Sequence, residues 1–366
     1  MKFKKQIAGL QAYQPGKTTE EVKQMFNLDK VTKLASNENP YGASAKVKEY
    51  LDNVTIDYAI YPDGYASRLR SAVAKHVNVS EKQLLFGNGS DDNILIVSRA
   101  LLQPGLNTVL ADVTFGQYKH NAIVEGAEVR TVPLLLNGEH DLDSMAAEVD
   151  ENTAIVWVCN PNNPTGTLIP SDKIQAFVKK VPSDVLIVLD EAYTEYITDD
   201  TYQDSISLLK EHPNVLIMRT FSKAYGLASF RIGYAIGSEE VISQLEPLRE
   251  PFNNTVLSQE VAIIGLEDQA FIEACKEKNN VGKAQFEAYC QERNLHIYPS
   301  QTNFVLMEVK ADSDKVFQGL MQRGFIVRSG NVLGKPGYLR ITIGTEAENA
   351  GLLQKLDEVL TEEGVL

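Results

Sequence analysis

Short apolar runs alternate with amphipathic segments through the first two thirds of the chain. The runs at 154–159, 185–189 and 215–218 have the length and the continuous apolar character of strands that are buried on both faces. The segment 67–76 instead repeats its apolar residues every three to four positions, which is typical of a helix with one buried face. Strands that alternate with helices build a parallel sheet covered by helices, so the pattern predicts an α/β fold.

The pattern changes after Gly237, where a long helical segment interrupted by Pro247 and Pro251 extends to about residue 280. At 366 residues the chain is too long for one simple core. Beyond the helical segment we expect strands at 302–307, 325–328 and 338–344 and helices at 312–323 and 346–360. We therefore predict four parts: an N-terminal arm at 1–35 that packs on the small domain, a large domain at 36–245, an interdomain helical segment at 246–280 and a small α+β domain at 281–366.

Composition disfavours several classes of protein. Lys and Arg number 35 and Asp and Glu 49, so the net charge is −14, which argues against a nucleic-acid partner. Cys159, Cys275 and Cys290 are odd in number and widely spaced, which favours a reducing, cytoplasmic location over a disulfide framework. The five histidines lack metal-ligand spacing, so we expect no metal site. We expect neither a signal peptide nor a membrane partner, because no apolar run approaches the roughly 20 residues of a spanning helix.

Polar side chains follow three successive predicted strands. Asn160, Asp190 and Lys223 each come after an apolar run, and they lie 30 and then 33 residues apart. That spacing matches a strand, a crossover helix and the next parallel strand. Because parallel strands end at the same edge of a sheet, the spacing predicts that an amide, a carboxylate and an amine meet in one crevice.

Two stretches have the composition of a phosphate site. Gly89, Ser90 and Asp91 open a predicted helix, and a helix N-terminus offers free N–H groups to an anion. Ser222 and Arg231 stand on either side of the lysine that follows the third strand. A lysine forms a Schiff base with an aldehyde while a serine and an arginine hold a phosphate, and pyridoxal phosphate carries both groups. For either stretch alone, an ordinary N-cap or a surface lysine is the alternative interpretation.

The stretch 220–233, together with the loops at 37–42, 160–166 and 190–193, resembles the fold-type I pyridoxal-phosphate aminotransferases. The resemblance implies a large domain with a mostly parallel seven-stranded sheet between helices, and a smaller α+β domain. It also implies a homodimer with shared active sites. The implied contacts of pyridoxal 5′-phosphate are Gly89, Ser90, Asp91, Phe115, Asn160, Asp190, Tyr193, Ser222, Lys223 and Arg231, with Tyr61 contributed by the partner subunit.

Three of these residues are expected to be catalytic by the same resemblance. Lys223 would hold the cofactor as a Schiff base and move the substrate's α-proton, and Asp190 would pair with the protonated ring nitrogen. Tyr193 and Asn160 would contact the phenolic oxygen of the cofactor. Phe115 would stack on the ring at a position where many family members have a tyrosine, which keeps the stacking and loses a hydroxyl.

Over nearly the whole chain, the resemblance is closer to the histidinol-phosphate aminotransferases than to the aspartate or aromatic enzymes. It implies transamination of L-histidinol phosphate with 2-oxoglutarate, which gives imidazole acetol phosphate and L-glutamate in L-histidine biosynthesis. The implied substrate-binding residues are Tyr13, Asn37, Arg328 and Arg340. Arg340 stands between two apolar residues of a predicted strand, and a buried arginine needs an anion, which is either a substrate or a structural carboxylate.

Two enzymatic alternatives stay open at this point, and a non-enzymatic one is disfavoured. A phosphothreonine decarboxylase and an aromatic amino acid transaminase share the fold and the motifs, and motifs do not show which bond at the substrate's Cα is broken. A non-catalytic regulator that binds the cofactor is disfavoured, because the roughly 35 residues before the first motif are too few for a DNA-binding domain and the net charge has the wrong sign.

Overall fold

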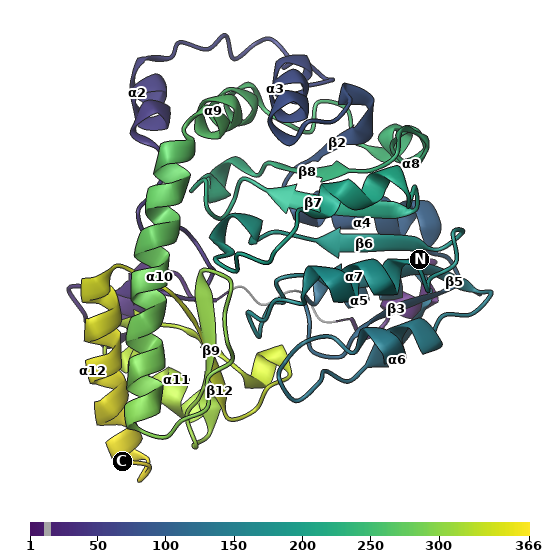
Figure 1. The fold of residues 1–366 in the computed structure, drawn as a ribbon. Helices are drawn as coiled ribbons and strands as arrows, with labels where there is room; N and C mark the ends of the chain where they lie inside the picture. The colour runs from purple at the N-terminus through teal and green to yellow at the C-terminus, as the bar shows by residue number, and fades with distance from the viewer. Residues whose placement is uncertain (11–15) are drawn as a thin grey trace.

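The computed structural model describes residues 1–10 and 16–366, and its largest element is a twisted sheet of seven strands (Figure 1). The strands lie in the order β2-β8-β7-β6-β5-β3-β4. All neighbours are parallel except at β8, which is antiparallel to both β2 and β7. The prediction of a mostly parallel seven-stranded sheet is confirmed. The strands are β2 (Leu84–Gly87), β3 (Asn107–Ala111), β4 (Glu128–Val132), β5 (Thr153–Cys159), β6 (Leu186–Asp190), β7 (Val215–Thr220) and β8 (Gly233–Ile236).

Helices cover both faces of this sheet and create two apolar cores. The alternation of side chains along β5 shows the division: Val156 and Val158 join one core, whereas Ile155 and Trp157 join the other. The strand sequences are continuously apolar because both faces of the sheet are buried. The first core includes residues of α3 (Ser67–Val77), α6 (Leu142–Ala147), α7 (Ser171–Val178) and α9 (Val256–Glu267). The second includes residues of α4 (Ser90–Leu101), α5 (Gln117–Glu125) and α8 (Glu239–Leu245).

The C-terminal part builds a separate core around a three-stranded antiparallel sheet of order β11-β12-β9. Its strands are β9 (Phe304–Glu308), β11 (Arg328–Ser329) and β12 (Tyr338–Thr342), and its helices are α10 (Gln269–Glu292), α11 (Ser313–Gln322) and α12 (Glu346–Glu362). The strand predicted at 325–328 is divided, because β10 (Phe325–Ile326) pairs instead with β1 (Thr32–Lys33) in a two-stranded parallel sheet. Over the residues that the structure describes, no helix combines the length and the apolar composition needed to cross a bilayer.

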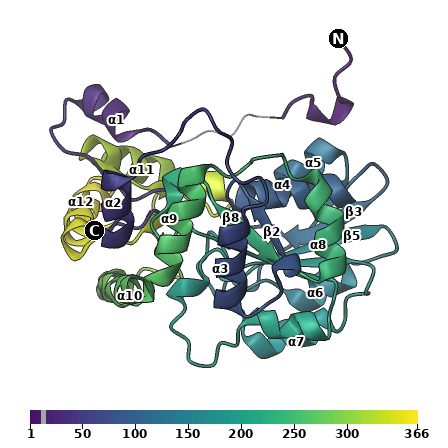
Figure 2. The ribbon, with the colours of Figure 1, turned by 90° about the horizontal axis from the view of Figure 1, so that it is seen from above.

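The N-terminal arm lies in two places (Figure 2). The helix α1 (Thr19–Phe26) contributes Val22 to a small apolar cluster with Met321 of α11. The next helix, α2 (Ala45–Asn53), begins after the arm. The first residues lie instead on α5 of the large sheet, where Lys4 Nζ pairs with Glu125 at 3.2 Å. These first residues therefore do not lie on the small domain, where we expected them. The physical reason is that a lysine finds favourable acceptors at the C-terminal end of a helix.

Candidate active site

The ends of β5, β6 and β7 lie side by side, as the spacing of their polar residues predicts. Asp190, the last residue of β6, is in register with Cys159 of β5 and with Met218 of β7. Lys223 follows β7 by three residues, and its Nζ lies 5.8 Å from the ring centroid of Tyr193. The carboxylate and the amine therefore both lie at the carboxyl edge of the parallel strands, on neighbouring strand ends.

Asp190 is a buried carboxyl group, only 4% exposed. Its Oδ2 accepts a hydrogen bond from the hydroxyl of Tyr118 at 2.6 Å, and its Oδ1 accepts from the backbone N–H of Ala192 at 3.2 Å. Burial raises the pKa of Asp190 to about 6. The hydrogen bond from Tyr118 has the opposite effect and lowers this pKa. The group is consequently ionised at neutral pH, and a buried carboxylate of this kind favours a cationic partner.

Tyr118 is a site residue that our sequence reasoning missed. It lies in α5, three residues after Phe115, and the two rings meet edge to face with centroids 5.7 Å apart. Its ring also stacks on Trp157 of β5 at 4.7 Å with an interplanar angle of 10°. The short spacing along the chain was an available signal for contact between the two rings, although Phe115 lies just before the first turn of α5. The contact between Tyr118 and the carboxylate of Asp190 gave no signal in the sequence, because 72 residues separate the two partners.

Lys223 has the electrostatic surroundings of a reactive amine. Burial, followed by the positive charge of Arg340, lowers its pKa to about 8. Its Nζ donates a hydrogen bond to the backbone oxygen of Ser36 at 3.2 Å. A lysine with a pKa near 8 is neutral far more often than an ordinary lysine, and the neutral amine is the form that acts as a nucleophile or a base.

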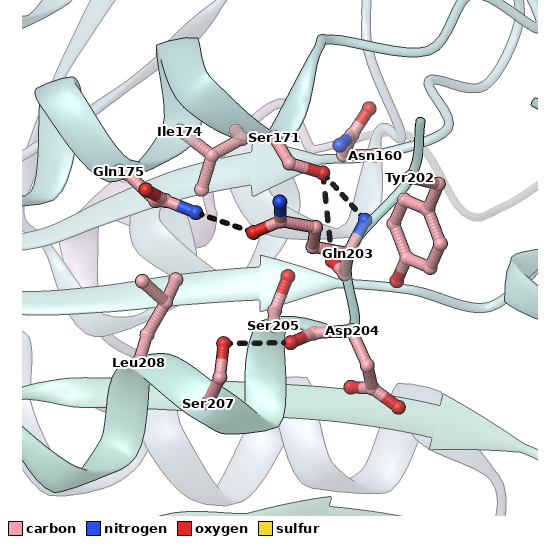
Figure 3. A pocket seen from close by; sticks show the side chains of 10 residues that line it. All are labelled: Asn160, Ser171, Ile174, Gln175, Tyr202, Gln203, Asp204, Ser205, Ser207 and Leu208. Carbon is pink, nitrogen blue, oxygen red and sulfur yellow. Dashed lines mark hydrogen bonds between the residues drawn. The ribbon is translucent and has the colours of Figure 1, made fainter. Parts of the chain in front are cut away.

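The expectation for Asn160 requires a correction. Its side-chain Oδ1 accepts from the backbone N–H of Ile169 at 2.7 Å, and its Nδ2 donates to the backbone oxygen of the same residue at 3.2 Å. Asn160 also lines the small cavity of Figure 3, together with Ser171 and Gln203. Both polar atoms of this amide are therefore committed to the turn that follows β5.

Asn163, three residues further along the same loop, has the position that we expected for Asn160. Its Oδ1 accepts from Arg340 Nη1 at 2.8 Å, and its Nδ2 donates to the hydroxyl of Tyr193 at 3.4 Å. Asn37 donates to the same hydroxyl at 3.0 Å. Burial raises the pKa of Tyr193, so its phenol keeps its proton. An amide, a phenol and a guanidinium thus adjoin each other in the site.

The glycine turn before α4 and the loop after β7 form a second, cationic part of the site. Arg231 Nη1 donates to the hydroxyl of Ser222 at 3.2 Å, and its Nη2 lies 3.6 Å from Asp91 Oδ2. Gly89 caps α4 with φ +82°, and a Cβ there would collide with the guanidinium of Arg231. Ser90 is the first residue of α4, whose N-terminus offers unpaired N–H groups. The arrangement suits a phosphate group.

Two arginines lie directly opposite each other in the small sheet. Arg328 of β11 and Arg340 of β12 are partners in the antiparallel register. Arg340 is 8% exposed and donates to Asn163 and, through Nη2, to the backbone oxygen of Ala35 at 2.6 Å. Like charges in opposite positions repel, so an anion between them would be favourable. Tyr13, the other residue expected here, lies outside the described residues.

Tyr61 points outward from the protein. Its side chain is 76% exposed, and its ring stacks on Phe252 with centroids 4.6 Å apart. The loop that carries it is held in place, since Arg249 donates to the backbone oxygen of Gly64 at 2.8 Å and Gln259 donates to that of Asp63 at 3.0 Å. Tyr61 also lines a surface groove of about 420 Å³.

Comparison with known proteins identifies relatives over the full length. The family model for class I and II aminotransferases matches residues 29–356. The chain is 59% identical over 365 residues to the histidinol-phosphate aminotransferase of Lysinibacillus sphaericus (strain C3-41), and the alignment covers 100% of each chain. This level of identity over the full length of both chains shows that the two proteins belong to one family.

Solved structures give the same picture of the fold. The histidinol-phosphate aminotransferase from Sinorhizobium meliloti, a crystal structure in complex with pyridoxal-5′-phosphate, superposes with a TM-score of 0.90 at 28% identity, with 98% of each chain covered. The L-threonine-O-3-phosphate decarboxylase from Porphyromonas gingivalis superposes with a TM-score of 0.78 at 22% identity, covering 90% of this chain and 100% of that one. At that identity the second likeness concerns the fold alone.

Proposed function

This chain belongs to the class I and II aminotransferase family, and on that premise we propose that it transfers the amino group of L-histidinol phosphate to 2-oxoglutarate. The products are imidazole acetol phosphate and L-glutamate, and the reaction is a step of L-histidine biosynthesis. The name of the relative that is 59% identical supports this substrate. The structural observation that carries the proposal is the pair of opposed arginines, Arg328 and Arg340, of which Arg340 lies close enough to Lys223 to lower its pKa.

The donor set of the site fits pyridoxal 5′-phosphate. Asp190 is a buried, ionised carboxylate suited to a protonated ring nitrogen, and Phe115 would cover one face of the ring. Tyr193 and Asn163 would hold the phenolic oxygen. The residues for the phosphate are Gly89, Ser90, Asp91, Ser222 and Arg231, with Tyr61 from a second subunit. When bound, this cofactor forms a Schiff base with amines and accepts the electrons released when a bond at the substrate's Cα breaks.

The protein's own residues direct the proton transfers. Lys223, whose lowered pKa favours the neutral amine, would take the proton from the substrate's Cα through its Nζ and would later give a proton back to complete the transfer. Asp190, as a buried carboxylate, would keep the ring nitrogen of a bound cofactor protonated. Tyr193, with its raised pKa, remains a hydrogen-bond donor rather than a base. Since the two substrates react in turn, the kinetics should be of the ping-pong type.

One site has to accept two differently charged substrates. Glutamate carries an α-carboxylate, whereas histidinol phosphate carries a phosphate ester and no carboxylate. An arginine suits both, because its planar fork binds either group through two hydrogen bonds. We assign Arg340 to the carboxylate or the phosphate, Arg328 and Tyr13 to the phosphate, and Asn37 to the wall of the pocket.

We also propose a homodimer in the cytoplasm. The exposed pair of Tyr61 and Phe252 beside a groove supports a subunit contact at that surface, since large exposed aromatic side chains mark interaction sites. The three unpaired, buried cysteines support a reducing compartment. Sedimentation of the purified protein tests the dimer, and a monomer at micromolar concentration would exclude shared active sites.

A panel of amino donors with 2-oxoglutarate tests the substrate. We expect histidinol phosphate to give the highest kcat/KM, because it alone combines a phosphate for the arginine pair with an imidazole ring. Phenylalanine and phosphothreonine serve as the comparison donors, and carbon dioxide release is measured in parallel. Release of carbon dioxide from phosphothreonine without formation of glutamate would favour the decarboxylase that shares the fold. The fastest turnover with phenylalanine would favour an aromatic transaminase.

A further inference from the structure

Tyr118 is a buried phenol to which the reaction as described gives no role. Its side chain is 0% exposed, and its hydroxyl is 2.6 Å from Asp190 Oδ2. The other carboxylate oxygen accepts from the backbone of Ala192 at 3.2 Å. The carboxyl group of Asp190 is therefore held on both oxygens, one by the main chain and one by a side chain that substitution can remove.

The hydrogen bond has a defined direction at neutral pH. Burial, followed by the negative charge of Asp190, raises the pKa of Tyr118 well above the usual value for a phenol. The hydroxyl consequently keeps its proton and acts as the donor, and the carboxylate is the acceptor. A donor that faces a carboxylate stabilises the ionised form over the protonated form, which opposes the effect of burial on Asp190.

The ring of Tyr118 has little freedom to leave this position. It stacks on Trp157 at 4.7 Å on one face and meets the ring of Phe115 edge to face at 5.7 Å. Trp157 belongs to the buried strand β5, and it is 0% exposed. Tyr118 thereby joins the residue assigned to the ring nitrogen of the cofactor with the residue assigned to its face.

We propose that Tyr118 is a positioning residue that holds Asp190 ionised and oriented for a protonated pyridine nitrogen. The inference rests on the proposed function, because Asp190 acquires its partner only if pyridoxal phosphate is bound. Tyr118 itself touches neither the substrate nor the reacting atoms. Its effect on the reaction is exerted through the protonation state and the orientation of Asp190.

The test is the substitution Tyr118→Phe, which removes one oxygen and keeps the ring. Asp190 is titrated in the cofactor-free protein by NMR of ¹³C-labelled aspartate carboxyl groups, with Asp190→Asn to assign the signal. We expect a midpoint near pH 6 in the unchanged protein and a rise of about 1–2 pH units in the variant, because a hydrogen bond to a charged group is lost. The acid limb of pyridoxal phosphate binding, measured by equilibrium dialysis against pH, should move upward by the same amount.

A matched control and a second variant make the outcome decisive. Tyr289 donates to Asp357 at 2.8 Å in the small domain, so Tyr289→Phe removes the same kind of bond outside the site and should leave the Asp190 midpoint unchanged. Incorporation of 3,5-difluorotyrosine at position 118 strengthens the donor with little change of shape, and it should move the midpoint downward. This variant also decides the question if Tyr118→Phe does not fold.

Two failures are distinguishable. An Asp190 midpoint that stays unchanged in the position-118 variants, or that moves in the same direction in both, would overturn the role of Tyr118 while leaving the proposed function intact. An unchanged protein that does not bind pyridoxal phosphate at any pH would overturn the proposed function itself.

Discussion

Replacing Lys223 by Ala lowers the rate of transamination by about 10⁴-fold or more, because one amine serves both as the covalent anchor and as the proton carrier. The substitution removes the amine whose pKa is lowered to about 8 and leaves Asp190 and the phosphate residues in place. The cofactor should therefore still bind, but without a covalent link. Reduction with borohydride followed by mass spectrometry measures this directly: the unchanged protein gains the mass of the cofactor on Lys223, and the variant does not.

Another lysine whose pKa is lowered by burial supplies the control. Lys283 in α10 is 9% exposed, donates to the backbone oxygen of Ser300 at 3.1 Å, and has a pKa that burial lowers. Lys283→Met removes an amine that lies in α10 and follows no strand of the large sheet, so it should retain turnover and the adduct on Lys223. A Lys223→Ala protein that keeps more than about a hundredth of the activity would contradict the assignment.

Replacing Arg340 by Ala should lower kcat/KM of both half-reactions by about 10²–10³-fold. Removal of one partner of a buried, charge-assisted pair costs roughly 2–5 kcal/mol, which corresponds to about 30-fold to about 4,000-fold and includes that range. Single-turnover absorbance changes measure the two halves separately, with histidinol phosphate for one and glutamate for the other. Because Arg340 also donates to Ala35 and Asn163, thermal unfolding of each variant is measured alongside to establish that the fold is retained.

Arg328 gives the matched comparison, since it lies opposite Arg340 in the same register. Arg328→Ala should slow the half-reaction of histidinol phosphate and change that of glutamate by less than about threefold, because only the phosphate needs the second arginine. Arg340→Lys keeps the charge and loses the planar fork, so both half-reactions should remain impaired. If Arg340→Ala slowed one half-reaction alone, the idea of a shared anion site would be wrong.

The location of the candidate site was predictable because it depends on strand order. Asp190 and Lys223 each follow a continuously apolar run, and successive parallel strands joined by right-handed crossovers lie next to each other. The register of Asp190 with residues of β5 and β7 agrees with that prediction. The resemblance of the sequence motifs to those of a known family added the cofactor and the substrate, and the comparisons support the same family.

The direction of side chains in irregular segments was not predictable. Asn160 and Asn163 lie in one loop with the same side chain, and no periodicity distinguishes them. Only the fold of the turn decides that Asn160 pairs with Ile169, which leaves Asn163 to contact Arg340. The hydrogen bond from Tyr118 to Asp190 is of the same type, because a contact across 72 residues depends on how α5 packs on the sheet.

The amino-acid sequence alone determined the α/β class and the three strand ends that carry an amide, an acid and an amine, because hydrophobic periodicity and spacing are local properties of the chain. The tertiary structure decided which side chains meet at those ends, and it divided the strand predicted at 325–328 so that Arg328 lies opposite Arg340. The reason is physical. Contacts between distant segments depend on how helices and strands pack and pair, and the residues next to each position in the sequence have little influence on that.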